Sequence, residues 1–164
     1  MMAAIEKSDD LSQLYTLIHI VARSRPAGAE RLLQRHLGFA DDPQVAALAL
    51  HTLGVQWGCF GEVYEFTIAA LNGLDWDPIG DVQDAAITVA GEFLRERSDC
   101  GLLERLITLT LDADKWTAVH RFNALARALG ASQQDLAGLS ARVDEWSRDA
   151  IETRALERLD RECS

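Results

Sequence analysis

The chain of 164 residues has few of the features that interrupt or cross-link a fold. It contains only three prolines, which leaves room for long uninterrupted helices. Its three cysteines, Cys59, Cys100 and Cys163, have no CxxC spacing, which favours reduced thiols over a disulfide framework. We expect Cys59 and Cys100 to be small buried hydrophobic residues near the starts of helices.

Long hydrophobic runs are also missing. No apolar stretch approaches the roughly 20 residues that cross a bilayer. The N-terminal residues turn acidic at once, whereas a secretion signal begins with positive charge and continues with an apolar block. These two absences predict a cytoplasmic protein.

Positive charge is absent from a long internal segment. No Lys or Arg occurs from His36 to Leu94, although the whole chain has 16 bases and 26 acids and a net charge of −10. Acids without a neighbouring base project a negative field into solvent, which argues against nucleic acid or an anionic membrane as a ligand. A basic protein surface is the complementary partner. The acids of the segment are Asp41, Asp42, Glu62, Glu65, Asp75, Asp77, Asp81, Asp84 and Glu92.

Motifs of catalysis and metal binding do not occur. The chain has no GxSxG, GxxxxGK[ST], GxGxxG or HExxH, and its four histidines form no Cys/His cluster at zinc spacing. The segment from Asp75 to Asp81 begins like a calcium loop, but Ile79 and Ala86 stand where ligands five and twelve belong. We therefore expect no enzyme activity, no metal and no cofactor.

Apolar residues recur every three or four positions in six segments, and no segment alternates as a strand would. This spacing is typical of amphipathic helices and predicts an all-α fold. The segments run over 11–22, 29–37, 45–53, 63–74, 82–94 and 103–111.

Capping signals agree with the helical spacing. Asp42-Pro43 and Asp77-Pro78 are each predicted to be an N-cap followed by a first-turn proline. Gly130 is a plausible helix stop, and Ser132 to Asp135 is a weak capping box. Gly91 lies inside a helical segment, where we expect it to allow close approach of a neighbouring helix.

The chain repeats a pattern that runs from Glu to Gly. Glu30 precedes Gly54 by 24 residues, and the two later intervals, which end at Gly91 and Gly130, each span 26. The glycines lie 37 and then 39 positions apart. A period of this length, built from two helices per unit, is typical of an α-solenoid.

The segment from Asp42 to Gly54 reads Asp-x-x-Val-x-x-x-Ala-x-x-x-Leu-Gly and resembles HEAT-like repeats. The resemblance implies a single domain over 1–164: an α-solenoid of about four HEAT-like helix pairs with a C-terminal capping helix. The predicted pairs cover about 9–38, 42–75, 80–112 and 114–148, and the terminal helical segment covers 149–163. A solenoid offers surfaces instead of pockets, so the repeat favours partner binding.

The predicted binding residues lie mainly in equivalent turns. If the turns stack in register, carboxylates and a tryptophan from each would line one edge, as an interface for a basic partner requires. The alternative is that the acids cap helices in solvated turns and that the tryptophans belong to the core. The predicted partner-binding residues are Glu65, Asp75, Trp76, Asp77, Asp112, Asp114 and Trp116.

The resemblance also bears on function, because small acidic HEAT-like proteins include immunity proteins of toxin–immunity pairs. It implies a non-enzymatic binding module whose acidic face covers a basic toxin. The alternative is a general scaffold or assembly adaptor with several weaker partners. HEAT-like folds also include lyases and DNA-repair glycosylases, but a glycosylase needs a basic surface that the segment from His36 to Leu94 lacks.

Overall fold

The computed structural model describes residues 11–113, 118–137 and 147–163. Within these ranges the chain forms nine α-helices and one short π-helical segment, and it has no strand. The predicted all-α fold is confirmed. None of the described helices is long and apolar enough to cross a membrane.

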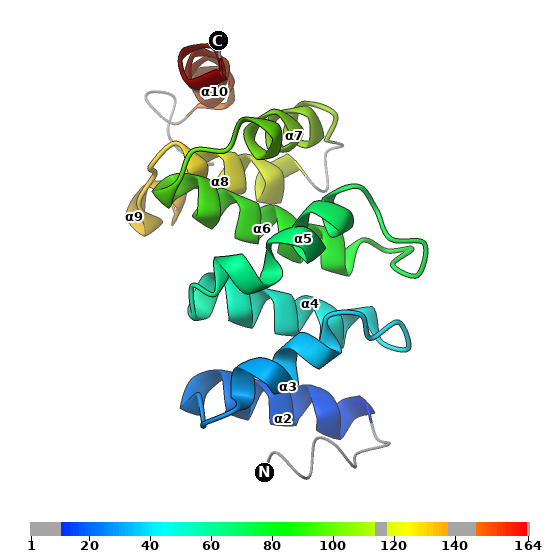
Figure 1. Ribbon diagram of the computed structural model, residues 1–164. Coiled ribbons are helices and arrows are strands. Elements are labelled where there is room, and N and C mark those ends of the chain that lie inside the picture. Colours follow the sequence, from blue (N-terminus) through cyan, green and yellow to red (C-terminus); the bar gives the residue numbers. More distant parts are fainter. Residues whose placement is uncertain (1–10, 114–117, 138–146, 164) are drawn as a thin grey trace. The chain divides into compact units, whose positions relative to one another are not determined.

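The chain divides into two compact units, Met1–Val89 and Ala90–Ser164, where the sequence predicts a single domain. The boundary falls within helix α6 (Asp81–Glu96), so this helix contributes residues to both units. Figure 1 follows the order of the helices along the chain.

The first unit is built on α4, which packs against the two helices before it. Its core is aliphatic, with Ile18, Leu33, Leu50 and Val82 completely buried. Burying such side chains contributes about 1.5–3 kcal/mol each to folding. The elements of this unit that precede α6 are α2 (Leu11–Ser24), α3 (Ala29–His36), α4 (Pro43–His51), the π-helical segment η1 (Thr52–Gln56) and α5 (Phe60–Leu71).

Two predicted helix starts have different outcomes. Asp42 is the N-cap of α4, its carboxylate accepting the Gln44 N–H at 3.0 Å, and Pro43 occupies the first turn as predicted. The prediction for Asp77-Pro78 is wrong in its boundary, because α6 begins at Asp81 and Pro78 lies in the preceding loop.

The predicted third helix does not continue regularly to Leu53. It changes to π-helical geometry at Thr52, and the Trp57 N–H bonds back to the Thr52 carbonyl at 3.0 Å. Gly54 lies in this segment against Val89, and a Cβ atom there would stand only 2.6 Å from the valine side chain. The absence of a side chain at Gly54 therefore lets η1 approach α6 closely.

The described part of the second unit contains the end of α6 and four further helices, with α10 packed on both α7 and α8. Gly91 has the predicted function, because a Cβ atom there would lie 2.5 Å from the Ala124 carbonyl oxygen. The predicted stop at Gly130 is also confirmed, with a φ of 94° just after α8. The helices are α7 (Cys100–Leu111), α8 (Ala118–Ala128), α9 (Gln133–Ala137) and α10 (Arg148–Cys163).

The capping box is present at the start of α9. The Asp135 carboxylate accepts both the N–H and the hydroxyl of Ser132, at 2.8 and 2.6 Å, and the Ser132 hydroxyl accepts the Asp135 N–H. The predicted fourth pair, 114–148, falls partly outside the described residues. The predicted terminal segment 149–163 corresponds to α10 and matches it within one residue.

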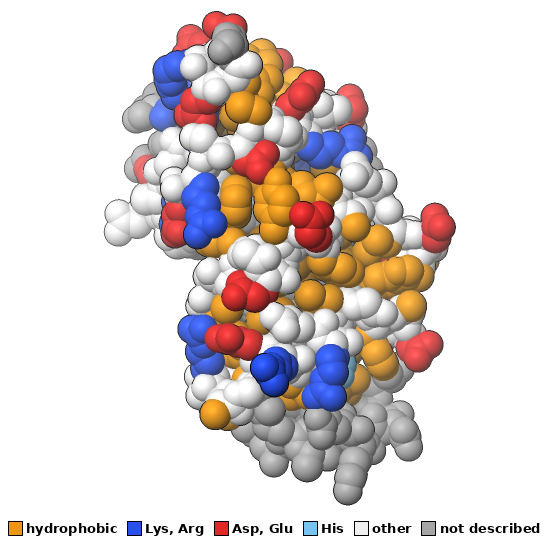
Figure 2. Space-filling model, viewed as in Figure 1, with side chains coloured by type: hydrophobic (Ala, Val, Ile, Leu, Met, Phe, Trp, Pro, Cys, Tyr) orange, Lys and Arg blue, Asp and Glu red, His pale blue; other side chains and the backbone are white. Residues whose placement is uncertain are grey.

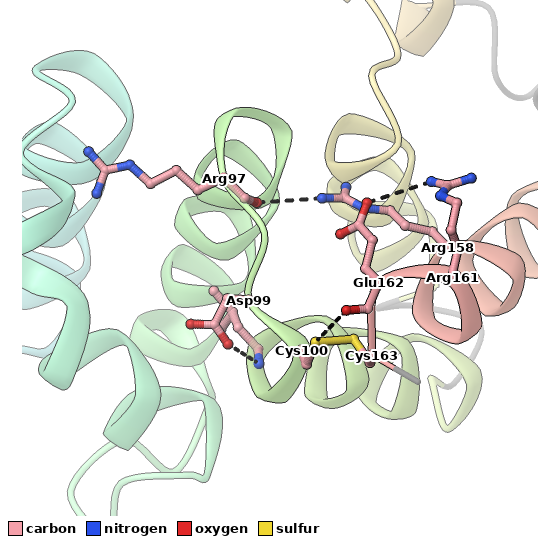
Figure 3. Close-up of a disulfide and its surroundings, with 8 residues drawn as sticks. Arg97, Asp99, Cys100, Arg158, Arg161, Glu162 and Cys163 are labelled. Carbon is pink, nitrogen blue, oxygen red and sulfur yellow. Dashed lines mark hydrogen bonds and ion pairs between the residues drawn. A yellow bond between two sulfur atoms is a disulfide. The ribbon is translucent and has the colours of Figure 1, made fainter.

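The prediction of three reduced thiols is wrong, because Cys100 and Cys163 form a disulfide and only Cys59 is free. Cys100 opens α7 and Cys163 closes α10, so the bond joins two helix ends that are 63 positions apart in sequence (Figure 3). Both cysteines are exposed, contrary to the expected burial of Cys100. Spacing in sequence could not reveal a pair that only the packing of α10 on α7 brings together.

Arg158 fixes α10 beside the same bond. Its guanidinium donates to the Arg97 carbonyl at 3.4 Å and its Nε donates to Glu162 at 3.0 Å (Figure 3). The guanidinium also donates to the carbonyls of Ala128 and Leu94 at 2.5 and 3.0 Å. These carbonyls belong to the ends of α8 and α6, where no helical N–H remains to satisfy them. A single side chain therefore caps two helices and holds a third.

Candidate functional site

The loop between α5 and α6 carries two acids of the base-free segment, Asp75 and Asp77. It is shaped by two hydrogen-bonded turns, in which the Asp77 N–H donates to Leu74 at 2.9 Å and the Gly80 N–H donates to Asp77 at 3.2 Å. Gly80 adopts a φ of 87°, a conformation that side chains disfavour. The loop is therefore held in a defined conformation.

Asp77 fastens this loop to α6. Its Oδ2 accepts the N–H groups of Val82 and Gln83 at 2.9 and 3.1 Å, which satisfies two of the free donors at the helix start. The side chain is only 8% exposed, and its Oδ1 is buried with no hydrogen-bond partner among the described residues. The structure thus gives Asp77 the capping role that the sequence left as an alternative, and a partner would have little direct access to it.

Other residues of the loop face solvent. Asp75 is exposed, Trp76 is partly buried, and the side chain of Ile79 is 86% exposed. Figure 2 shows hydrophobic side chains gathered on this face over the α5–α6 loop. Ile79 was missed as a site residue, although its position between Pro78 and Gly80 signals an apolar side chain that no helix face can bury.

Carboxylates from three parts of the first unit act on Asp81. The pKa of Asp81 is raised above its ordinary 3.8, first by partial burial and then by Asp77, Asp84 and Asp42, while a hydrogen bond from Gln44 lowers it. Like charges that raise a pKa destabilise the ionised form. The base-free segment therefore does concentrate negative charge locally, and we call Asp42, Asp77, Asp81 and Asp84 the acidic cluster.

One acid of the base-free segment, Glu92, does not add to this local negative charge. Glu92 is 5% exposed and forms ion pairs with Arg127 and Arg95, the latter at 3.2 Å. Both arginines lie beyond the end of the segment. Glu92 is therefore neutralised within the second unit.

The remaining predicted site residues are spread along the chain. Glu65 is exposed on α5 in the first unit, and Asp112 is exposed just after α7 in the second. Asp114 and Trp116 lie outside the described residues. The structure thus places Glu65, Asp75, Trp76 and Asp77 in the first unit, and the ladder that would join them to the later residues stays a prediction.

The second unit has a cavity of about 360 Å³ that is lined mainly by charged side chains. Arg95, Arg154, Arg158 and Arg161 line it together with Glu157 and Glu162. Arg158 is committed to backbone carbonyls, and Arg161 lies 3.6 Å from Glu162. Glu162 also pairs with Arg158, and Arg95 pairs with Glu92 and Glu96, so at least three of the four arginines that line this cavity have a carboxylate partner.

No group of three His, Cys, Asp or Glu side chains in the described ranges could hold a metal ion. No protein-family model, curated protein or solved structure matches the chain. The acidic cluster and the exposed loop beside it together form the candidate binding site.

Proposed function

We propose that the protein is a non-enzymatic binding module whose acidic first unit binds a basic protein partner. The observation that carries the proposal is the acidic cluster, in which Asp81 keeps a raised pKa because of burial and neighbouring carboxylates. A cation supplied by a partner would relieve this repulsion, since no Lys or Arg occurs in the segment from His36 to Leu94.

Charge is unevenly divided between the units, which supports the same location for binding. Residues 1–89 contain 12 acids and 5 bases, a net −7, and residues 90–164 contain 14 acids and 11 bases, a net −3. Complementary potentials accelerate the encounter of two proteins and disfavour partners of the wrong sign. The first unit is therefore the better docking surface for a basic protein.

The exposed loop between α5 and α6 adds apolar and aromatic side chains to the acidic surface. Interface hot spots are enriched in Trp, Tyr and Arg and are surrounded by residues that exclude water. Ile79 is 86% exposed and adjoins the partly buried Trp76 and the capping carboxylate of Asp77, which holds the loop in position. A preformed loop avoids the entropy loss of ordering on binding. We assign Ile79 to the interface together with Asp75, Trp76 and Asp81.

The more specific parts of the proposal come from the repeat. We propose that the helices pair as four HEAT-like repeats of an α-solenoid, and that the protein acts as an immunity protein that covers a cognate toxin. The support is the Glu-to-Gly period and the acidic charge. An inhibitor binds one partner tightly, whereas an assembly adaptor binds several weakly, so the measured affinity separates these two functions.

The cellular location is part of the proposal. The sequence favours the cytoplasm, but thiols there are kept reduced, and disulfides persist in oxidising compartments. The bond between Cys100 and Cys163 therefore favours an oxidising compartment. The redox state of these two cysteines in protein taken directly from cells decides between the two locations.

Titration calorimetry of the full chain with hexalysine and hexaglutamate tests the charge of the partner. We expect hexalysine to bind and hexaglutamate not to bind. The hexalysine affinity should fall steeply as salt rises from about 0.01 to about 0.1 M, because the Debye length shortens from about 30 to about 10 Å. Equal behaviour of the two peptides, or no heat with either, would contradict the proposal.

A further inference from the structure

A cavity of about 320 Å³ opens beside the acidic cluster in the first unit. It lies within the size range of ligand pockets, which begins near 300 Å³. Three helices line it: α2 through Tyr15, α4 through Gln44, Ala47, Leu48 and His51, and α6 through Asp81 and Ala85.

The wall of the cavity combines apolar side chains, aromatic rings and one carboxylate. Leu48, Ala47 and Ala85 give an apolar side, and Tyr15 and His51 contribute rings. The Tyr15 ring contacts the His19 ring edge-on, with centroids 4.8 Å apart, which supports its orientation. Such a wall suits the aliphatic stem and flat head of a long side chain.

Of the described residues that line the cavity, only Asp81 is an acid. Gln44 donates a hydrogen bond to the Asp81 carboxylate. Asp42, the N-cap of α4, fixes the first turn of the helix that carries Gln44. Among the described residues, no Lys or Arg lines the cavity. Within the described ranges the cavity therefore offers Asp81 no cation.

We propose that this cavity receives an arginine side chain of the basic partner, with Asp81 accepting hydrogen bonds from the guanidinium. Arginine fits better than lysine because its planar head stacks on aromatic rings and binds a carboxylate through two parallel hydrogen bonds. Its methylene stem lies along Leu48 and Ala85. This inference rests on the proposed function and names the side chain that the acidic unit recognises.

The test compares hexa-arginine with hexalysine by titration calorimetry of the full chain at about 0.1 M salt. Hexa-arginine should bind the wild type at least about fivefold more tightly, because lysine lacks the bidentate and stacking contacts. Asp81→Asn should weaken hexa-arginine about tenfold, as expected when a charged hydrogen-bond partner is lost.

Two variants separate the cavity from the overall charge. Glu62→Gln removes one exposed acid of the same unit and should change either affinity less than about twofold. Ala85→Leu narrows the cavity without changing charge and should abolish the preference for arginine. Circular dichroism confirms that each variant is folded.

The outcomes are distinct. Equal losses for Asp81→Asn and Glu62→Gln, or equal affinities of wild type for the two peptides, would overturn the arginine site and leave the basic partner intact. No binding of either peptide, even at about 0.01 M salt, would overturn the proposed function as well.

Discussion

Loss of the Cys100–Cys163 disulfide should destabilise the second unit strongly. The bond closes a loop of 63 positions, and the entropy that such a cross-link removes from the unfolded chain corresponds to about 4 kcal/mol. With a urea dependence of about 2 kcal/mol per M, the unfolding midpoint should fall by about 2 M. The variant is Cys163→Ser, and reduction of the wild type should reproduce its effect.

The matched control is Cys59→Ser, which removes the free thiol of the first unit. We expect its midpoint to respond to a reducing agent as the wild type does, whereas Cys163→Ser should not respond at all. Alkylation of the unreduced protein in denaturant should modify one cysteine. Three modified cysteines, or a wild-type midpoint unchanged by reduction, would refute the reasoning.

Three further predictions, two of them with a matched control variant, concern other parts of the fold. Arg158→Met removes the donor to three helix-end carbonyls and should lower the free energy of unfolding by about 2 kcal/mol. In the same urea titration, the exposed Arg161→Met should change the free energy of unfolding by less than about 0.5 kcal/mol. Gly91→Ala places a methyl group against the Ala124 backbone and should lower the free energy of unfolding by about 1–3 kcal/mol. Gly101→Ala, whose new Cβ would meet only Asp99 at 3.8 Å, should be neutral or stabilising. The reverse order would contradict the close approach at Gly91. Asp81→Asn should raise the thermal midpoint at pH 7, because an acid whose pKa is raised in the folded protein destabilises the fold once it is ionised. The gain should vanish below the ordinary pKa of 3.8, where Asp81 is protonated in both the folded and the unfolded chain. A gain that grows as the pH falls would contradict the raised pKa.

Local patterns in the sequence predicted local structure well. The 3.6-residue spacing located the helices, and the Asp42 cap, the Ser132 box and the Gly91 contact all occur as expected. These features depend on residues within a turn of one another, or on a single residue too small to block a neighbouring helix. Short-range chemistry decides them.

Features that depend on distant residues were not predictable in the same way. Asp77 caps α6 from five positions before Val82, so its pairing with Pro78 gave the wrong helix start. The disulfide needs α10 to pack on α7, and the arginine-accepting cavity needs α2, α4 and α6 together. The acidic character of the site could be predicted from the missing bases, but its shape could not.

The most direct test of the central claim compares two triple variants with the same net charge. Asp75→Asn, Asp81→Asn and Asp84→Asn neutralise three acids of the first unit. Glu104→Gln, Asp149→Asn and Asp160→Asn neutralise three exposed acids of the second, so each triple takes the chain from −10 to −7. At about 0.1 M salt, where charges farther than about 10 Å are screened, the first triple should weaken hexalysine binding at least about tenfold and the second less than about twofold. Equal losses would show that total charge binds the peptide and that the first unit has no special role.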